Sequence, residues 1–425
     1  MKSAITAIRG YRIWDSRGRP TVEAEVLLES GARGRGLAPA GASRGRHEAV
    51  DLRDGGTLLG GLGVEGAVEN INGPIGRALT GMDARDQEAI DMAILALDGT
   101  PNKSKLGGNA TIAVSMAVLN AAAAHAGEPL WRYLAGGREV RLPLPEVQIF
   151  GGGAHAARRT DIQDFMVMPV GAQSFDEALV MCANVYRAAG EQMEKLGRRA
   201  GVADEGGWWP DFRSNEEALQ ILVRSIEAAG YRGGELAISL DIAASEFGGE
   251  GRYKLGLDES ELDTAQWIEV LLGWIARYPI LSIEDPVAED DAEGMRAFTA
   301  AVGHRVQVIG DDFLVTNAAR VASAVASAAC NAVLLKPNQA GTITETRRAM
   351  EVARTAGWGM IVSARSGETE DTTIVHLATG WNTGQLKVGS FARSERMAKW
   401  NEGLRIEAEL GKAARFAGRA ALPIA

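Results

Sequence analysis

The sequence predicts an α/β protein in which an N-terminal α+β domain precedes a (β/α)8 barrel. After about residue 140, short apolar segments alternate with amphipathic helical segments, a rhythm typical of a mostly parallel sheet. Several apolar segments end in a charged residue, as in barrels that build an active face from strand ends. An open doubly wound sheet would need a G-x-G-x-x-G turn after a strand, and the sequence has none there. We therefore assign residues 1–140 to an N-terminal lid domain and 141–425 to the barrel.

The N-terminal domain begins with strands and continues with helices. Residues 21–31 (TVEAEVLLESG) alternate apolar and polar side chains, as a half-buried strand does, and 29–36 (ESGARGRG) are predicted to form a turn. The Gly-rich loop 38–49 (APAGASRGRHEA) is expected to move. Helical periodicity extends from residue 66 to residue 127, with a break at 98–108 (DGTPNKSKLGG).

The barrel strands are predicted from apolar runs. A new strand is expected within 136–150, and later ones within the ranges 235–243, 279–286, 306–312, 332–338, 359–366 and 385–390. Amphipathic segments such as 215–230 and 342–357 are predicted helices between them. At or near the ends of the later strands lie Asp241, Glu284, Asp311, Lys336, Arg365 with Ser366, and Lys387.

Composition excludes several classes of partner. The net charge is −10 and no basic run is present, which argues against a nucleic-acid groove or an anionic membrane surface. The first residues lack the apolar core of a signal peptide, and no apolar run reaches transmembrane length. Cys182 and Cys330 are isolated, which indicates buried thiols and a cytoplasmic location. A small anionic substrate would therefore be held by local cations or by a metal.

Three carboxylates at successive strand ends, those of Asp241, Glu284 and Asp311, predict a metal site. Hard oxygen ligands on separate rigid elements suit Mg²⁺. The alternative is that each acid caps the helix that follows it. Convergence of all three on one barrel face favours the metal.

Two lysines follow, and they predict base chemistry. A lysine beside other cations and a metal is expected to have a lowered pKa, as a general base requires, and we assign that role to Lys336. Lys387 is assigned to the base or to the substrate carboxylate. Such a base with a metal is typical of proton removal next to a carboxylate. Glu205 is a candidate acid for a leaving group, and the segment 152–165 adds His155, Gln163 and Asp164.

The sequence resembles the enolase family from about residue 4 to 420. The resemblance rests on the ordered motifs DSRGRPTVEAEV, DGTPNKSKLGGNA, GGAHA, DIQDFMVMPVGA, DEGG, LDIAASEF, SIEDP, GDDFLVTN, LKPNQAGTITET, RSGETEDT and RIEAELG. It implies a modified barrel whose second strand is antiparallel. It also implies that Asp241, Glu284 and Asp311 bind the first Mg²⁺ and that Ser43 closes on a second.

The same resemblance implies roles for the remaining residues. Lys336 matches the base, Lys387 the lysine near the substrate carboxylate, and Glu205 the acid that helps the hydroxyl depart. Arg365, Ser366 and Gln163 match contacts in or near the phosphoryl site, and His155 matches a loop histidine beside that site.

Four departures from the family pattern cluster on the leaving-group side. Ala364 replaces a histidine, Asp164 a glutamate, Trp208 and Trp209 smaller side chains, and Gly151 an asparagine. Ala364 would make room for a bulkier ligand, and Trp208 would reshape the wall of the substrate pocket. A further departure affects a pair across the family's dimer, where Tyr11 and Ala408 replace an Arg and a Glu. A homodimer or larger homo-oligomer is still expected, because a rim salt bridge usually contributes little.

The residues together predict a Mg²⁺-dependent hydro-lyase that removes the α proton and eliminates water from 2-phosphoglycerate, as in glycolysis, or from a close analogue. One alternative is a carboxyphosphonoenolpyruvate synthase-type paralogue of phosphonate biosynthesis. The other is a non-catalytic binding protein, which retention of the carboxylates, lysines and Ser43 disfavours. Proton abstraction without elimination is disfavoured by Glu205 and Arg365.

Overall fold

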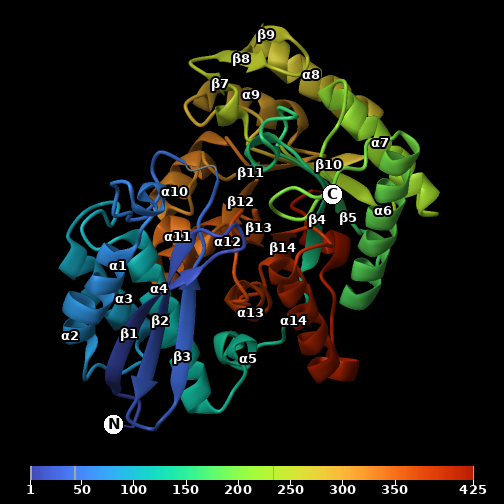
Figure 1. The fold of residues 1–425 in the computed structure, drawn as a ribbon. Coiled ribbons are helices and arrows are strands. Elements are labelled where there is room, and N and C mark those ends of the chain that lie inside the picture. The colour runs from blue at the N-terminus through green and yellow to red at the C-terminus, as the bar shows by residue number, and fades with distance from the viewer. Residues whose placement is uncertain (1, 43–44, 233, 425) are drawn as a thin grey trace.

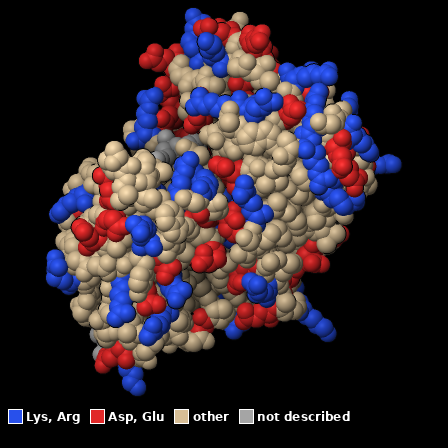
Figure 2. Space-filling model, viewed as in Figure 1, with Lys and Arg blue, Asp and Glu red and all other residues tan. Residues whose placement is uncertain are grey.

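The chain folds into a small N-terminal domain beside a larger barrel (Figure 1). The structure is a computed structural model that describes residues 2–42, 45–232 and 234–424. Within these residues, none of the helices has both the length and the apolar composition needed to cross a bilayer. On the face drawn in Figure 2, acidic and basic side chains are interspersed rather than gathered into a patch of one sign.

The N-terminal domain is a three-stranded antiparallel sheet packed on helices. The strands are β1 (Ile5–Trp14), β2 (Pro20–Leu28) and β3 (Arg33–Ala38), paired in that order. Residues 29–32 form the predicted turn between β2 and β3, whereas residues 33–36 of the segment predicted as a turn belong to strand β3. Its glycines serve packing, since a Cβ on Gly34 would lie 2.1 Å from the Ala121 nitrogen and one on Gly36 would lie 2.3 Å from the Ala113 oxygen.

The helices of this domain cover one face of the sheet. They are α1 (Glu65–Asn70), a π-helical turn (Ile71–Ile75), α2 (Gly76–Leu79), α3 (Gln87–Asp98), α4 (Gly108–Ala126) and α5 (Leu130–Ala135). Helix α4 is buried along most of its surface, as its uniformly small and apolar composition predicts. It packs against β3 on one side and contacts helix α11 (Pro337–Ala340) of the barrel on the other, so it joins the two domains.

Eight strands close the barrel. In chain order they are β4 (Leu144–Gly151), β5 (Asp164–Met168), β6 (Ala237–Asp241), β10 (Ile280–Glu284), β11 (Gln307–Gly310), β12 (Ala332–Leu335), β13 (Gly359–Ser363) and β14 (Gly384–Gly389). The second strand, β5, runs antiparallel to both neighbours, and the other pairings are parallel. The predicted fold class and the reversed second strand are confirmed.

Helices surround the barrel, and a small sheet extends it. The helices are α6 (Phe175–Lys195), α7 (Asn215–Ala228), α8 (Thr264–Arg277), α9 (Ala292–Val302), α10 (Ala318–Ser327), α12 (Ile343–Thr355), α13 (Thr373–Gly380) and α14 (Ser394–Leu410). Strands β7 (Gly248–Gly249), β8 (Arg252–Leu255) and β9 (Ser260–Asp263) form the small sheet between β6 and α8. It lies at the top of the view in Figure 1, away from the N-terminal sheet.

The strand order brings the predicted functional residues to one end of the barrel. Asp241 and Glu284 are the last residues of β6 and β10 and pair across those strands. Because β5 is reversed, its first residue, Asp164, lies beside Asp241 at the same end. Asp311 and Lys336 directly follow β11 and β12, so side chains from separate strands face one space.

Candidate active site

A polar pocket of about 320 Å³ occupies this end of the barrel. Its walls come from strand ends, from the loop before β5 and from the N-terminal domain. The lining residues are Gly41, His155, Gln163, Asp164, Glu205, Asp241, Lys336, Ser363, Ala364, Arg365, Ser366, Lys387 and Val388. Most of the residues predicted from the sequence therefore meet in one cavity.

One side of the pocket holds carboxylates paired with lysines. The Lys387 Nζ lies 2.8 Å from a carboxylate oxygen of Asp241 and 2.8 Å from one of Glu284. The Lys336 Nζ lies 2.5 Å from Asp311 Oδ2. All five side chains are buried, so these pairs act in a medium where charges interact strongly.

Burial and neighbouring charges perturb these groups. Burial raises the pKa of Glu284 well above its usual value, and repulsion from Asp241 adds to the rise. Burial would lower the pKa of Lys336, but attraction to Asp311 outweighs it and leaves the pKa raised. The protein's own groups therefore raise the pKa of Lys336, whereas a lowered pKa was expected. The charges of Arg365 and Lys387 do lower this pKa, as expected, but the attraction to Asp311 is stronger.

The donor set fits a hard divalent cation. Asp241, Glu284 and Asp311 offer only oxygen ligands, and Glu284 Oε1 is buried without a hydrogen-bond partner among the described residues, as an oxygen reserved for a metal would be. Asp285, Asp311 and Asp312 also bring carboxylate oxygens within 4.8 Å of one another. Ser43, the expected ligand of a second ion, lies outside the described residues.

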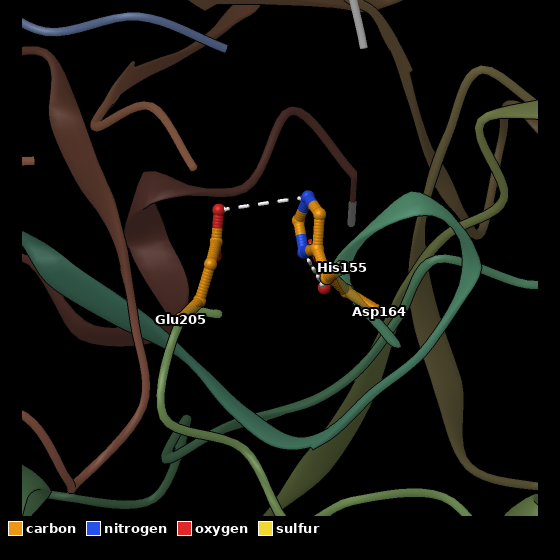
Figure 3. Close-up of side chains that lie close together, drawn as sticks. All are labelled: His155, Asp164 and Glu205. Atoms are coloured by element: carbon orange, nitrogen blue, oxygen red, sulfur yellow. Dashed lines mark ion pairs between the residues drawn. The ribbon is translucent and has the colours of Figure 1, made fainter. Parts of the chain in front are cut away.

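The pocket also holds a histidine between two acids, and one of these acids, Asp164, lies 3.5 Å from Lys387 Nζ. His155 Nδ1 lies 3.4 Å from Asp164 Oδ1, and His155 Nε2 lies 3.8 Å from Glu205 Oε1 (Figure 3). Burial would lower the pKa of His155, but the charges of Glu205 and Asp164 outweigh it and raise the pKa. Burial raises the pKa of Glu205, while attraction to His155 opposes that rise. The contacting pair of His155 and Glu205 thus tends to hold a proton.

Arg365, the predicted anion-binding residue, already forms an ion pair within the protein. Arg365 donates from both terminal nitrogens to Glu48, at 2.9 and 3.2 Å, so a buried bidentate pair joins the barrel to the N-terminal domain. Ser366 Oγ accepts from the Ala42 backbone at 3.1 Å and lies 3.1 Å from His155 Nε2. Ser366 therefore connects the loop of the N-terminal domain to the histidine.

Comparison with known families decides the assignment. Residues 5–134 match the family described as Enolase, N-terminal domain, and residues 139–424 match Enolase, C-terminal TIM barrel domain. The chain belongs to the enolase family. Membership supports an enzyme of the enolase-superfamily lyase type, and the predicted recognition is confirmed.

The departures from the enolase pattern are not all in the pocket. Ala364 lines it and is buried. Trp208 does not line it, contrary to its assignment as a substrate contact. Its ring stacks on Tyr186 with centroids 4.8 Å apart, and its indole nitrogen donates to the Tyr186 carbonyl at 2.8 Å. Trp208 therefore fixes the segment after Glu205 against α6.

Gln163 is placed beside a predicted metal ligand rather than beside the arginine. Its Nε2 donates to Asp241 Oδ2 at 3.0 Å, and its Oε1 is buried with no hydrogen-bond partner in the described part of the chain. The enolase resemblance places this residue in or near the phosphoryl site. The free acceptor faces no described donor and remains available to a ligand.

Several residues that support the site were missed from the sequence. Arg396 of α14 is fully buried and donates to the carbonyl oxygens of Arg365 and Val388, each at 2.8 Å. Lys399, one turn later, donates to Thr369 O at 2.8 Å and pairs with Glu368. The sequence did hold a signal for them. Arg396 and Lys399 are basic residues three positions apart on the helix after the last strand, so both lie on one face of that helix.

Proposed function

We propose that this enolase-family protein is a Mg²⁺-dependent lyase that removes the α proton of 2-phosphoglycerate, or of a close phospho- or phosphono-carboxylate, and eliminates water. The observation that supports this most is the meeting of two kinds of group in one pocket. Lys336, paired with Asp311, is a candidate base, and the contacting pair His155 and Glu205 is a candidate proton donor. An elimination of water needs a base near the α proton and an acid near the departing hydroxyl.

The reaction balances without a further reactant. The Lys336 amine takes the proton from the α carbon, and the electron pair of that C–H bond becomes the new C=C bond. The C–O bond at the β carbon breaks, and the departing hydroxide takes a proton from the Glu205–His155 side. The products are an enolpyruvate phosphate and water.

Lys336 must be a neutral amine before it can accept that proton. Its ion pair with Asp311 favours the ammonium form, so any cation that competes for Asp311 favours the neutral amine. Asp241, Glu284 and Asp311 would hold the magnesium ion, which stabilises the negative charge of the ene-diolate. Lys387, buried among the same acids, would then face the substrate carboxylate.

The test is a continuous ultraviolet assay with 2-phosphoglycerate and Mg²⁺, with Lys336→Met as the negative control. We expect formation of the conjugated enol product by the wild type alone. Product formation that is equal in both proteins would show that Lys336 is not the base. A cytoplasmic location and a homo-oligomer complete the proposal.

A second candidate is the carboxyphosphonoenolpyruvate synthase-type reaction, which the alanine at position 364 favours. Ala364 lines the pocket where the family has a histidine, so a larger substituent has room beside Arg365 and Ser366. The same assay with the carboxyphosphono analogue separates the two. A higher kcat/KM for the analogue would select the second reaction, and one for 2-phosphoglycerate the first.

A further inference from the structure

Gln148 lies at the centre of the leaving-group side, although it does not line the pocket. It belongs to β4, its side chain is fully buried, and both ends of its amide are bonded. The nitrogen donates to Asp164 Oδ1, and the oxygen accepts from the Gly207 backbone at 2.8 Å. Gly207 is two residues after Glu205. One amide therefore ties the loop that carries Glu205 to the carboxylate that faces His155.

Two neighbouring glycines leave the space that this amide fills. A Cβ on Gly151 would lie 3.1 Å from Gln148 Oε1 and 2.7 Å from the Ala203 Cβ, and one on Gly207 would lie 2.5 Å from Gln148 Oε1. Gly151 and Asp164 also pair across β4 and β5. Two departures from the family pattern, Gly151 and the shortened acid Asp164, thus adjoin the same buried side chain.

We propose that Gln148 is a positioning residue that sets Asp164 and the Glu205 loop relative to His155. This rests on the proposed function, because it concerns the elimination half of that reaction. The Gln148 side chain, from β4, and the shorter Asp164 side chain, from β5, meet in a hydrogen bond; we call these two side chains the two arms. A Cβ on either Gly151 or Gly207 would crowd the Gln148 amide oxygen, so the two glycines leave the space in which this amide reaches Asp164.

The inference separates the two halves of the reaction. Among the described residues Lys336 pairs with Asp311, whereas Asp164 pairs with His155 and lies 3.5 Å from Lys387 Nζ. A change at Gln148 should therefore slow loss of the hydroxyl but not removal of the α proton by Lys336. A small displacement of a catalytic group can cost about 100-fold in rate. A residue that only supported the fold would slow both halves together.

The first test uses Gln148→Met, which keeps the shape and removes both hydrogen bonds. We expect kcat for elimination to fall about 100-fold, while KM and the rate of α-proton exchange into deuterated water stay within about threefold. The matched control is Gln307→Met. Gln307 is an equally buried glutamine of the barrel, bonded to Ser282 at 3.0 Å and Gln385 at 2.9 Å. It should leave the ratio of exchange to elimination unchanged. An unchanged ratio in Gln148→Met would overturn the inference.

The second test asks whether the two arms act as one unit. Asp164→Glu and Gln148→Asn each change one arm by a methylene and should each slow elimination, whereas the double variant restores the summed length. If the two substitutions acted independently, their effects on the elimination rate would multiply. We expect the double variant to eliminate water at least tenfold faster than that product. Effects that simply multiply would contradict the coupling.

Failure of the proposed function would be distinguishable. It would appear as a wild type with neither exchange nor elimination on either substrate. The wild type, Asp164→Glu, Gln148→Asn and the double variant would then be compared by thermal unfolding. The proposal predicts that the Tm of the double variant is higher than the sum of the two single shifts would give. Additive shifts in Tm would overturn it.

Discussion

Replacing Lys336 by methionine should slow proton removal strongly and strengthen magnesium binding. Lys336 is buried and lies 2.5 Å from Asp311 Oδ2, while Asp311 also accepts from Gln339 at 2.8 Å. In the wild type a metal must compete with the ammonium group for this carboxylate. Methionine preserves the bulk and removes the competitor.

The magnitudes follow from the geometry. Two unit charges about 4 Å apart interact by about 4 kcal/mol at an effective dielectric constant near 20. Part of this is offset by desolvation, so we expect the Mg²⁺ affinity to rise at least about tenfold, or ~1.4 kcal/mol. Loss of the base should slow exchange by about 10²–10⁴-fold. Leaving Asp311 without its counter-ion should lower the free energy of unfolding of the metal-free protein by about 3 kcal/mol.

Isothermal titration with Mg²⁺ and proton exchange in deuterated water measure the two effects. The matched control is Lys399→Met, which removes another buried, paired lysine, 2.9 Å from Glu368. It should lower stability without changing the Mg²⁺ affinity more than about twofold, because it does not touch the strand-end carboxylates. Weaker or unchanged Mg²⁺ binding in Lys336→Met, or exchange within tenfold of the wild type, would refute the reasoning.

Three further predictions concern pH, thiols and packing. A hydrogen bond from His376 lowers the pKa of Glu402 from 4.5 to about 2, so its stabilisation is present above pH 4.5 and is lost as the pH falls towards 2. Urea unfolding should show a smaller loss of stability over that range in Glu402→Gln than in the wild type, and equal losses would contradict this. Burial raises the pKa of Cys182 and Cys330, so a thiol reagent at pH 8 should modify them only after denaturation; rapid modification of the native protein would be the opposite result. Gly34→Ala should destabilise the protein by more than ~2 kcal/mol, because its Cβ would overlap the backbone of α4; an unchanged Tm would show that α4 can move away.

Much of the barrel and of its active face was predictable from the sequence. Strand ends such as Asp241 and Glu284 stood out because an apolar run followed by an acid is a local pattern, and the structure brings them together. The sequence did not reveal that Lys387 lies between those two acids. That arrangement depends on the rotamers of side chains far apart in the chain.

Other features could not be read locally because they depend on neighbours distant in sequence. Gly34 resembles a turn residue, and only the approach of α4 shows that it belongs to a strand. Trp208 follows Glu205 closely, yet its large ring packs against α6 instead of the pocket. Gln148 had no recognisable motif, since its importance comes from Asp164 and Gly207, which lie on other segments.

The most direct test of the proposed chemistry is α-proton exchange of 2-phosphoglycerate and of its carboxyphosphono analogue, followed by proton NMR in deuterated water. With Mg²⁺ present, we expect the wild type to exchange the α proton of at least one of these acids. Exchange should stop after chelation of the metal and in Lys336→Met, in which the residue paired with Asp311 is gone. No exchange with either acid in the presence of Mg²⁺, or exchange that persists without the metal, would contradict the proposal.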